Sequence, residues 1–221
     1  FRGKVGIAVR RIDADWTVAW NGTALFPQQS VSKFWVALTF LDAVDRGKLR
    51  LTDTTTITKN DLTLFHQPSA AMVKAGGWTT SYSDLMRRAM TQSDNTANYL
   101  ANPPDGAAPT AIVGALAKLK QGDMLSTEST RLLLSVMAEA KTGPQRIKGG
   151  VPPGWSYLHK TGTGQDLAPR STGYNDIGIM TAPDGTSYAV AVLIGSTTVS
   201  IPERWALMQG VAKAVAANHQ R

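Results

Sequence analysis

A serine and a lysine three residues apart could supply a nucleophile and its base. Ser30 and Lys33 lie where an apolar pattern predicts the start of a helix from Val31 to Arg46. Residues three apart share a helix face, so the ammonium group of Lys33 can reach the hydroxyl of Ser30. A neutral Lys33 could accept the hydroxyl proton, and a helix N-terminus favours developing negative charge. The pair alone is weak evidence for catalysis, because Ser30 could equally cap the helix.

Two other short segments place polar side chains beside expected secondary structure. Residues 93–95 are Ser-Asp-Asn, which alone is typical of a turn or a helix cap, because these side chains hydrogen-bond to nearby backbone. Residues 160–162 are Lys-Thr-Gly and follow an expected strand from Trp155 to His159. The glycine would let a ligand approach the strand closely. Taken singly, each segment has an ordinary structural explanation.

In chain order, the three segments resemble a known signature. Ser-x-x-Lys, Ser-Asp-Asn and Lys-Thr-Gly occur in this order in class A β-lactamases and penicillin-binding proteins. Residues 61–68 resemble the loop at the edge of the class A cleft, and residues 183–185 and a final amphipathic helix also match. The similarity covers nearly the whole chain, and its compact layout favours a class A serine β-lactamase.

The resemblance implies a role for each matched residue. Ser30 would attack the lactam carbonyl, Lys33 would help to activate it, and Ser93 would relay a proton to the leaving nitrogen. Backbone N–H groups of Ser30 and Thr163 would form the oxyanion hole that a tetrahedral intermediate needs. Phe65 would be the aromatic at the edge of the cleft, and Asn95 would hold the amide of the substrate's side chain. The substrate carboxylate would bind to Lys160, Thr161 and Thr163.

The resemblance also implies an arginine beside the carboxylate pocket, and the sequence leaves its identity open. Asn175 stands about where some members of the family have this arginine. Arg146 or Arg170 could substitute for it, and either could equally be an ordinary surface charge. Asp94, in contrast, is expected to support its loop rather than to react.

The chain departs from the family in the group that hydrolyses the acyl-enzyme. Class A enzymes use a glutamate of a Glu-x-x-x-Asn pattern, on a loop between the second and third segments. The chain has three glutamates, Glu128, Glu139 and Glu203, and none of them opens such a pattern. Each lies at an expected helix end, where a capping or dipole role is ordinary. We therefore assign deacylation to none of them.

The stretch between residues 95 and 160 is also shorter than in the family, with an abrupt junction at Leu100–Ala101 inside an expected helix. Two explanations are open: the protein has the loop although the given sequence lacks it, or the protein lacks the loop. A helix cut in mid-pattern would leave apolar faces and backbone groups unsatisfied, which favours the first. Without the loop, the protein should be acylated and then stall.

Strands are expected at both ends of the chain and helices in the middle. This order predicts an α/β (α+β) fold, in which an antiparallel sheet from both chain ends is flanked by helices and carries an inserted all-helical lobe. Residues 1–25 and 155–221 would form the α/β lobe and residues 26–154 the helical lobe, with the active site between them.

The hydrophobic periodicity and the cap residues predict the individual elements. Residues 52–65 are rich in turn formers and are expected to be irregular. The expected strands cover residues 5–11, 16–20, 155–159, 177–181 and 188–195. The expected helices cover residues 31–46 and 109–120 and begin at Ser83, near Thr96, at Ser126 or Thr127, and after Ser200.

Composition limits the classes of partner and cofactor. The net charge is +7, but the cations are scattered and no basic run alternates with aromatics, so no nucleic-acid partner is expected. The chain has no cysteine and no visible cluster of metal ligands, so neither metal nor cofactor is expected. No stretch is apolar for long enough to span a membrane. We expect a monomer that binds a small β-lactam, periplasmic or secreted, with its leader already removed.

Other hydrolase or binding functions are also open. A DD-peptidase or an acylation-only penicillin sensor carries the same three segments but deacylates slowly, and it remains the alternative to a β-lactamase. A general esterase would need a Gly-x-Ser-x-Gly turn, which is absent. The histidines at 66, 159 and 219 show no triad arrangement, and His159 should face away from Lys160 across a regular strand.

Overall fold

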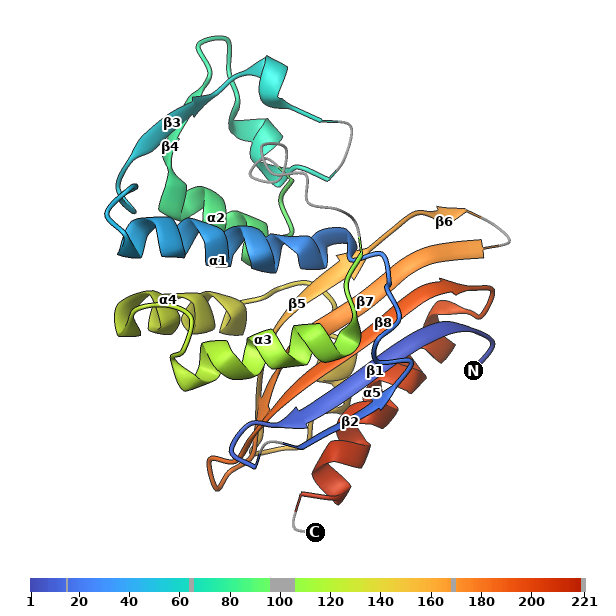
Figure 1. Ribbon diagram of the computed structural model, residues 1–221. Helices are drawn as coiled ribbons and strands as arrows, with labels where there is room; N and C mark the ends of the chain where they lie inside the picture. Colours follow the sequence, from blue (N-terminus) through green and yellow to red (C-terminus); the bar gives the residue numbers. More distant parts are fainter. Residues whose placement is uncertain (15, 64–65, 96–105, 168–169, 220–221) are drawn as a thin grey trace.

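The main sheet joins the two ends of the chain, as Figure 1 shows. A computed structural model describes residues 1–14, 16–63, 66–95, 106–167 and 170–219. The strand order is β2-β1-β8-β7-β5, each neighbouring pair is antiparallel, and β6 pairs with β7. The strands are β1 Gly3–Arg11, β2 Trp16–Trp20, β5 Ser156–Thr163, β6 Asp166–Leu167, β7 Arg170–Thr181 and β8 Ser187–Thr197. The predicted fold class is confirmed.

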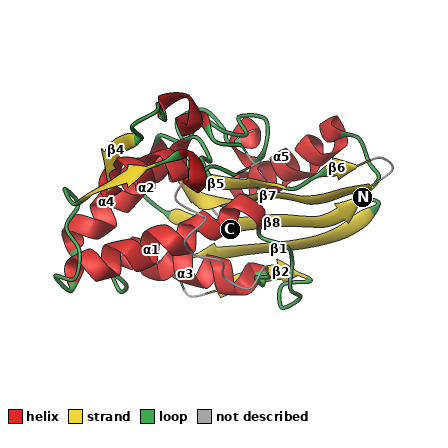
Figure 2. Cartoon of the chain, turned by 90° about the horizontal axis from the view of Figure 1, so that it is seen from above, coloured by secondary structure: helices red, strands yellow, loops and turns green. Residues whose placement is uncertain are grey.

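Helices lie on both faces of this sheet (Figures 1 and 2). Helices α1, α3 and α4 form a layer on one face, and α5 covers the other. The α-helices are α1 Ser32–Asp45, α2 Tyr82–Thr91, α3 Pro109–Gln121, α4 Thr127–Ala138 and α5 Ile201–Ala217. Short 3-10 turns are η1 Gln29–Val31, η2 Lys59–Asp61, η3 Pro68–Met72 and η4 Ile147–Gly150. Among the described residues, no helix is long and apolar enough to cross a membrane.

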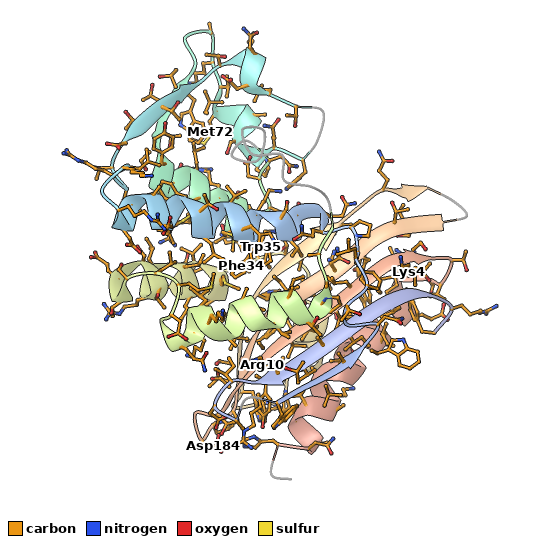
Figure 3. All side chains as sticks on the ribbon, in the orientation of Figure 1. Lys4, Arg10, Phe34, Trp35, Met72 and Asp184 are labelled. Carbon is orange, nitrogen blue, oxygen red and sulfur yellow. The ribbon has the colours of Figure 1, made fainter. Side chains whose placement is uncertain are left out.

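Two hydrophobic cores hold these layers together. The larger core lies between the sheet and the α1 side, where Phe34 and Leu41 of α1 are fully buried with Ile177 of β7. Figure 3 shows Phe34 on the side of α1 that faces the other helices. The smaller core lies between the sheet and α5 and includes Met208 and Val192. Burial on both faces explains why β8 is apolar along nearly its whole length.

Two expectations about the elements were wrong. Helix α2 is capped by Ser81, whose hydroxyl accepts from the backbone N–H of Asp84 at 3.1 Å, so the predicted cap Ser83 lies inside the first turn. The region expected to be irregular contains β3 Thr54–Ile57, which pairs with β4 Trp78–Ser81 in a separate two-stranded sheet. Both strands are threonine-rich and only partly buried, so they lack the apolar alternation that marks a strand.

The remaining expected elements lie within a few residues of their predicted places. The strands β5 and β7 both extend further toward the site than predicted, to Thr163 and from Arg170. The caps Ser126 and Ser200 each accept a hydrogen bond from the third residue of their helix. The helix expected near Thr96 lies outside the described residues. The boundaries predicted for the two lobes stay a prediction.

Candidate active site

Residues 27–30, called the nucleophile turn after the predicted role of Ser30, pack against the sheet. Gln29 adopts a left-handed φ of 53°, and Ser30 follows it in η1, which leads directly into α1. The side-chain amide of Asn175 on β7 donates to the carbonyl oxygens of Pro27 and Gln28, at 2.7 and 3.1 Å. A Cβ on Gly162 of β5 would lie 2.4 Å from the carbonyl oxygen of Gln28. Only a glycine therefore lets this turn and strand approach so closely.

Lys33 reaches Ser30 as its spacing predicts. Its Nζ donates to the hydroxyl of Ser30 at 2.8 Å, to Oδ1 of Asn95 at 2.7 Å and to the carbonyl oxygen of Ser93 at 3.3 Å. The side chain is almost fully buried. This burial lowers the pKa of Lys33 to about 8, although the nearby negative charge of Asp94 acts in the opposite direction. Lys33 can therefore both hold and release a proton near neutral pH.

The Ser-Asp-Asn segment forms the opposite side of the nucleophile. Ser93 has a left-handed φ of 59°, which turns the chain after α2. The carboxylate of the buried Asp94 accepts from the backbone N–H and hydroxyl of Ser69, at 2.8 and 2.6 Å. The amide nitrogen of Asn95 donates to the carbonyl oxygen of His66 at 2.8 Å. Asp94 thus ties its loop to η3, as expected for a supporting residue.

The Lys-Thr-Gly strand brings a second buried lysine to the same place. Nζ of Lys160 donates to the hydroxyl of Ser93 and to the carbonyl oxygen of Thr161, both at 2.9 Å. Lys160 is fully buried, and this burial lowers its pKa well below the usual value; the positive charges of Lys33 and Arg146 lower it further. Ser93 therefore contacts both lysines, Lys160 through its hydroxyl and Lys33 through its carbonyl oxygen.

Arg146 lies beside the end of β5, just before η4. Its guanidinium donates to the carbonyl oxygens of Gly162 at 2.9 Å and Asn175 at 2.6 Å, and to the hydroxyl of Thr163. It also stacks 3.8 Å from the centre of the Tyr174 ring. These contacts hold a permanent cation at the exposed Thr163. Arg146 is one of the two arginines considered from the sequence, and the structure places it here.

Three other expected positions have different outcomes. The side chain of Arg170 and the whole of Phe65 lie outside the described residues. The hydroxyl of Thr161 contacts that of Thr142 at 2.7 Å, and its side chain is almost fully buried. Asn175, which stands where some relatives have an arginine, instead holds the nucleophile turn. Sequence reasoning missed this role, since nothing in the spacing of Asn175 links it to residues 27 and 28.

The three glutamates all lie away from this cluster. Glu128 is in the first turn of α4, and Glu139 follows the same helix and pairs with Arg87. Glu203 forms a capping box with Ser200 at the start of α5. All three are exposed. No glutamate of the chain is therefore placed to activate water at Ser30, and the described residues contain no group of three metal-ligating side chains.

Comparison with known proteins agrees with this geometry. The chain matches the Beta-lactamase enzyme family over residues 1–101 and 104–219. It is 30% identical to the extended-spectrum β-lactamase PER-1 of Pseudomonas aeruginosa over 254 aligned positions, which cover 96% of this chain and 81% of that protein. The alignment is longer than the 221 residues of this chain, so PER-1 has residues with no counterpart here. The family match is interrupted next to the junction at Leu100–Ala101.

Solved structures share the fold. A β-lactamase from Chitinophaga pinensis is 27% identical, with a TM-score of 0.90 over 97% of this chain and 94% of that chain. An ancestral class A β-lactamase, GNCA, is also 27% identical, with a TM-score of 0.87 over 97% and 94% of the two chains. With the family match and the relative at 30% identity, these likenesses show that the chain belongs to the β-lactamase enzyme family, within its class A of serine enzymes.

Proposed function

We propose that this chain opens the β-lactam ring through a covalent acyl-enzyme on Ser30. The observation that supports this most directly is the 2.8 Å hydrogen bond from Nζ of Lys33 to the hydroxyl of Ser30. Lys33 is buried, and burial lowers its pKa to about 8, so a useful fraction of it is neutral near neutral pH. In that state Lys33 accepts the Ser30 proton as the hydroxyl attacks.

The bonds and protons of the acylation step can be assigned to side chains. The Ser30 oxygen forms a bond to the lactam carbonyl carbon, and the carbon–nitrogen bond of the ring breaks. Lys33 takes the hydroxyl proton, and the departing nitrogen receives a proton from the hydroxyl of Ser93. The step balances when the proton taken by Lys33 passes on to the Ser93 hydroxyl, so that one proton moves in total from Ser30 to the ring nitrogen. Nζ of Lys33 lies 3.3 Å from the carbonyl oxygen of Ser93, and Lys160 donates to the Ser93 hydroxyl at 2.9 Å. No atom leaves, so the adduct carries the full mass of the drug.

The strand side of the site is suited to an anion. A substrate carboxylate would lie against Lys160, Thr163 and Arg146, which supply two cations and a hydroxyl, and the hydroxyl of Thr161 would join them by leaving its contact with Thr142. Burial makes the positive charge of Lys160 costly in the free protein, and an arriving carboxylate would restore its preference for the protonated form. Asn95 would hold the substrate's side-chain amide. The oxyanion would bind to the backbone N–H groups of Ser30 and Thr163.

A slowly deacylating penicillin-binding protein is the second candidate. It is favoured by one observation: the chain has three glutamates and all are exposed at helix ends away from Ser30. The two candidates share acylation and differ only in how fast the ester is hydrolysed.

The test is the intact mass of the protein before and after mixing with a penicillin, together with the variant Ser30→Ala. We expect the wild-type protein to gain one drug mass, and the Ser30→Ala protein to gain none. An adduct that disappears as drug is consumed would support the hydrolase, and a persistent adduct would support the penicillin-binding protein. Labelling of Ser30→Ala, or no labelling and no consumption by the wild-type protein, would contradict the proposal.

Three expectations about the surroundings are part of the proposal. We propose a monomer, in the periplasm or secreted, with no nucleic-acid partner. The scattered cations of the sequence support the last point. Light scattering would test the monomeric state, and fractionation of the source cells would test the location.

A further inference from the structure

A buried carboxylate lies behind the proposed site, on the face of the sheet that α5 covers. Asp176 of β7 is completely buried. Its neighbour Ile177 pairs with Lys160 and faces the α1 side, so the side chain of Asp176 points the other way. Oδ1 accepts from Nδ1 of His159 at 2.9 Å, and Oδ2 accepts from the backbone N–H of Ile147 at 3.1 Å. The proposed chemistry uses none of these contacts.

These two hydrogen bonds connect the segments that carry the two cations of the anion pocket. His159 directly precedes Lys160 on β5, and Ile147 directly follows Arg146. One carboxylate therefore holds both segments from behind. Because β5 is an edge strand and Arg146 lies in a turn, neither segment is fixed by sheet pairing on both sides. A buried tie of this kind would set the distance between the two cations.

Asp176 also supplies negative charge where positive charge is concentrated. Lys33 and Arg146 lower the pKa of Lys160, while Asp176 acts in the opposite direction. Burial, and then the charge of Asp176, raise the pKa of Tyr157 well above its usual value. The other titratable groups close to this face include Tyr174 of β7 and Arg204 of α5. The centre of the Tyr174 ring lies 3.8 Å from the guanidinium of Arg146 and 5.5 Å from that of Arg204. Asp166 pairs with Arg204 at 3.3 Å, whereas Asp176 is the carboxylate whose charge raises the pKa of Lys160.

His159 contacts Asp176 through one of its two ring nitrogens. Its Nδ1 faces Asp176, and its Nε2 is buried without a hydrogen-bond partner among the described side chains and backbone. The single hydrogen bond from His159 and the one from the backbone of Ile147 therefore fix the orientation of the Asp176 carboxylate.

We propose that Asp176, oriented by His159, is a positioning residue for substrate binding: the buried anion that holds Lys160 and Arg146 in place and balances their charge. The inference rests on the proposed function, since it assigns a role to the anion pocket of that same site. It predicts that losing the charge of Asp176 weakens binding of anionic substrates and makes Lys160 lose its proton at a lower pH.

The experiment compares the wild-type protein with Asp176→Asn and with Asp184→Asn. Asp184→Asn removes the same charge from an exposed turn at the far end of the sheet, as Figure 3 shows. The rate of adduct formation with a penicillin is measured by intact mass against drug concentration, from pH 6 to pH 10. We expect Asp176→Asn to raise the half-saturating concentration roughly tenfold at pH 7. The rate of adduct formation should fall at high pH as Lys160 loses its proton, and we expect this fall to occur about one pH unit lower in the variant. Asp184→Asn should match the wild-type protein in both.

A folded Asp176→Asn protein with the wild-type half-saturating concentration and alkaline fall would overturn the inference. So would an equal loss at every pH, because a merely structural residue would act in that way. If this variant does not fold, the variants His159→Asn and His159→Leu provide the test. His159→Asn keeps a donor toward Asp176, so its half-saturating concentration should stay within about threefold of the wild-type value. His159→Leu removes the donor and should raise that concentration. Equal values for the two variants would contradict the proposal. Failure of the proposed function is distinguishable, because the wild-type protein itself would then form no adduct on Ser30.

Discussion

The two walls of the site use the same residue type for opposite purposes. On the helical wall, Lys33 contacts three neutral oxygen atoms, and burial lowers its pKa to about 8. On the sheet wall, Lys160 lies near Arg146 and is backed by the carboxylate of Asp176. Proton transfer requires a group that changes its protonation state near neutral pH, whereas binding an anion requires a positive charge when the anion arrives. Burial lowers the pKa of Lys160 as well, so on this wall the guanidinium of Arg146 and an arriving carboxylate would supply what keeps the pocket suited to an anion. The surroundings, rather than the residue type, separate the two tasks.

The largest effect should come from the helical wall. Lys33→Ala removes the group that accepts the Ser30 proton, so we expect the maximal acylation rate to fall by roughly 10²–10⁴-fold. The half-saturating drug concentration should change little, because Lys33 does not bind the substrate carboxylate. Stopped-flow measurement of acylation checks this, with Lys48→Ala as a control that removes an exposed lysine just beyond the same helix. A change confined to the half-saturating concentration would contradict the assignment of proton transfer to the helical wall and of anion binding to the sheet wall.

The sheet wall should show the opposite pattern. Arg146→Ala removes a buried cation beside Thr163, and one charge-assisted hydrogen bond contributes about 1.5–3 kcal/mol. We therefore expect the half-saturating concentration of a penicillin to rise about ten- to hundredfold, with a smaller change in the maximal rate. Lys148→Ala, which removes an exposed cation two residues away, should bind as the wild-type protein does. Thermal melting of each variant separates lost binding from lost folding.

The smallest effect is a rise of the acylation rate with pH at saturating substrate, which the helical wall should produce. Because the pKa of Lys33 in the folded protein is about 8, the neutral base fraction grows as pH rises through that value. At saturating substrate, we expect the acylation rate to increase about fivefold between pH 7 and pH 8. Rapid-quench mass measurements at each pH would show this rise, and Lys33→Ala should lack it. A flat wild-type profile would argue against Lys33 as the base.

Local patterns were sufficient to predict most of the elements and the lysine–serine pair. The apolar spacing of α1 fixes which face is buried, and three-residue spacing alone brings Lys33 to Ser30. The polar strands β3 and β4 were missed because threonine-rich segments without apolar alternation carry no such pattern. The cap of α2 was misplaced by two residues because Ser81 and Ser83 are equivalent as sequence signals, and only the backbone conformation separates them.

By itself, the sequence determined the three segments that carry the chemistry, their order and the elements on which they lie. Only the tertiary structure decided that Asn175 holds the nucleophile turn, that Arg146 stands at the end of β5, and that Asp176 lies behind both cations. The physical reason is distance along the chain. A helix or strand fixes contacts between near neighbours, whereas Arg146 meets Asn175 across 29 residues, and Asn175 meets Pro27 across 148. Such contacts depend on how the layers pack, and no local spacing encodes them.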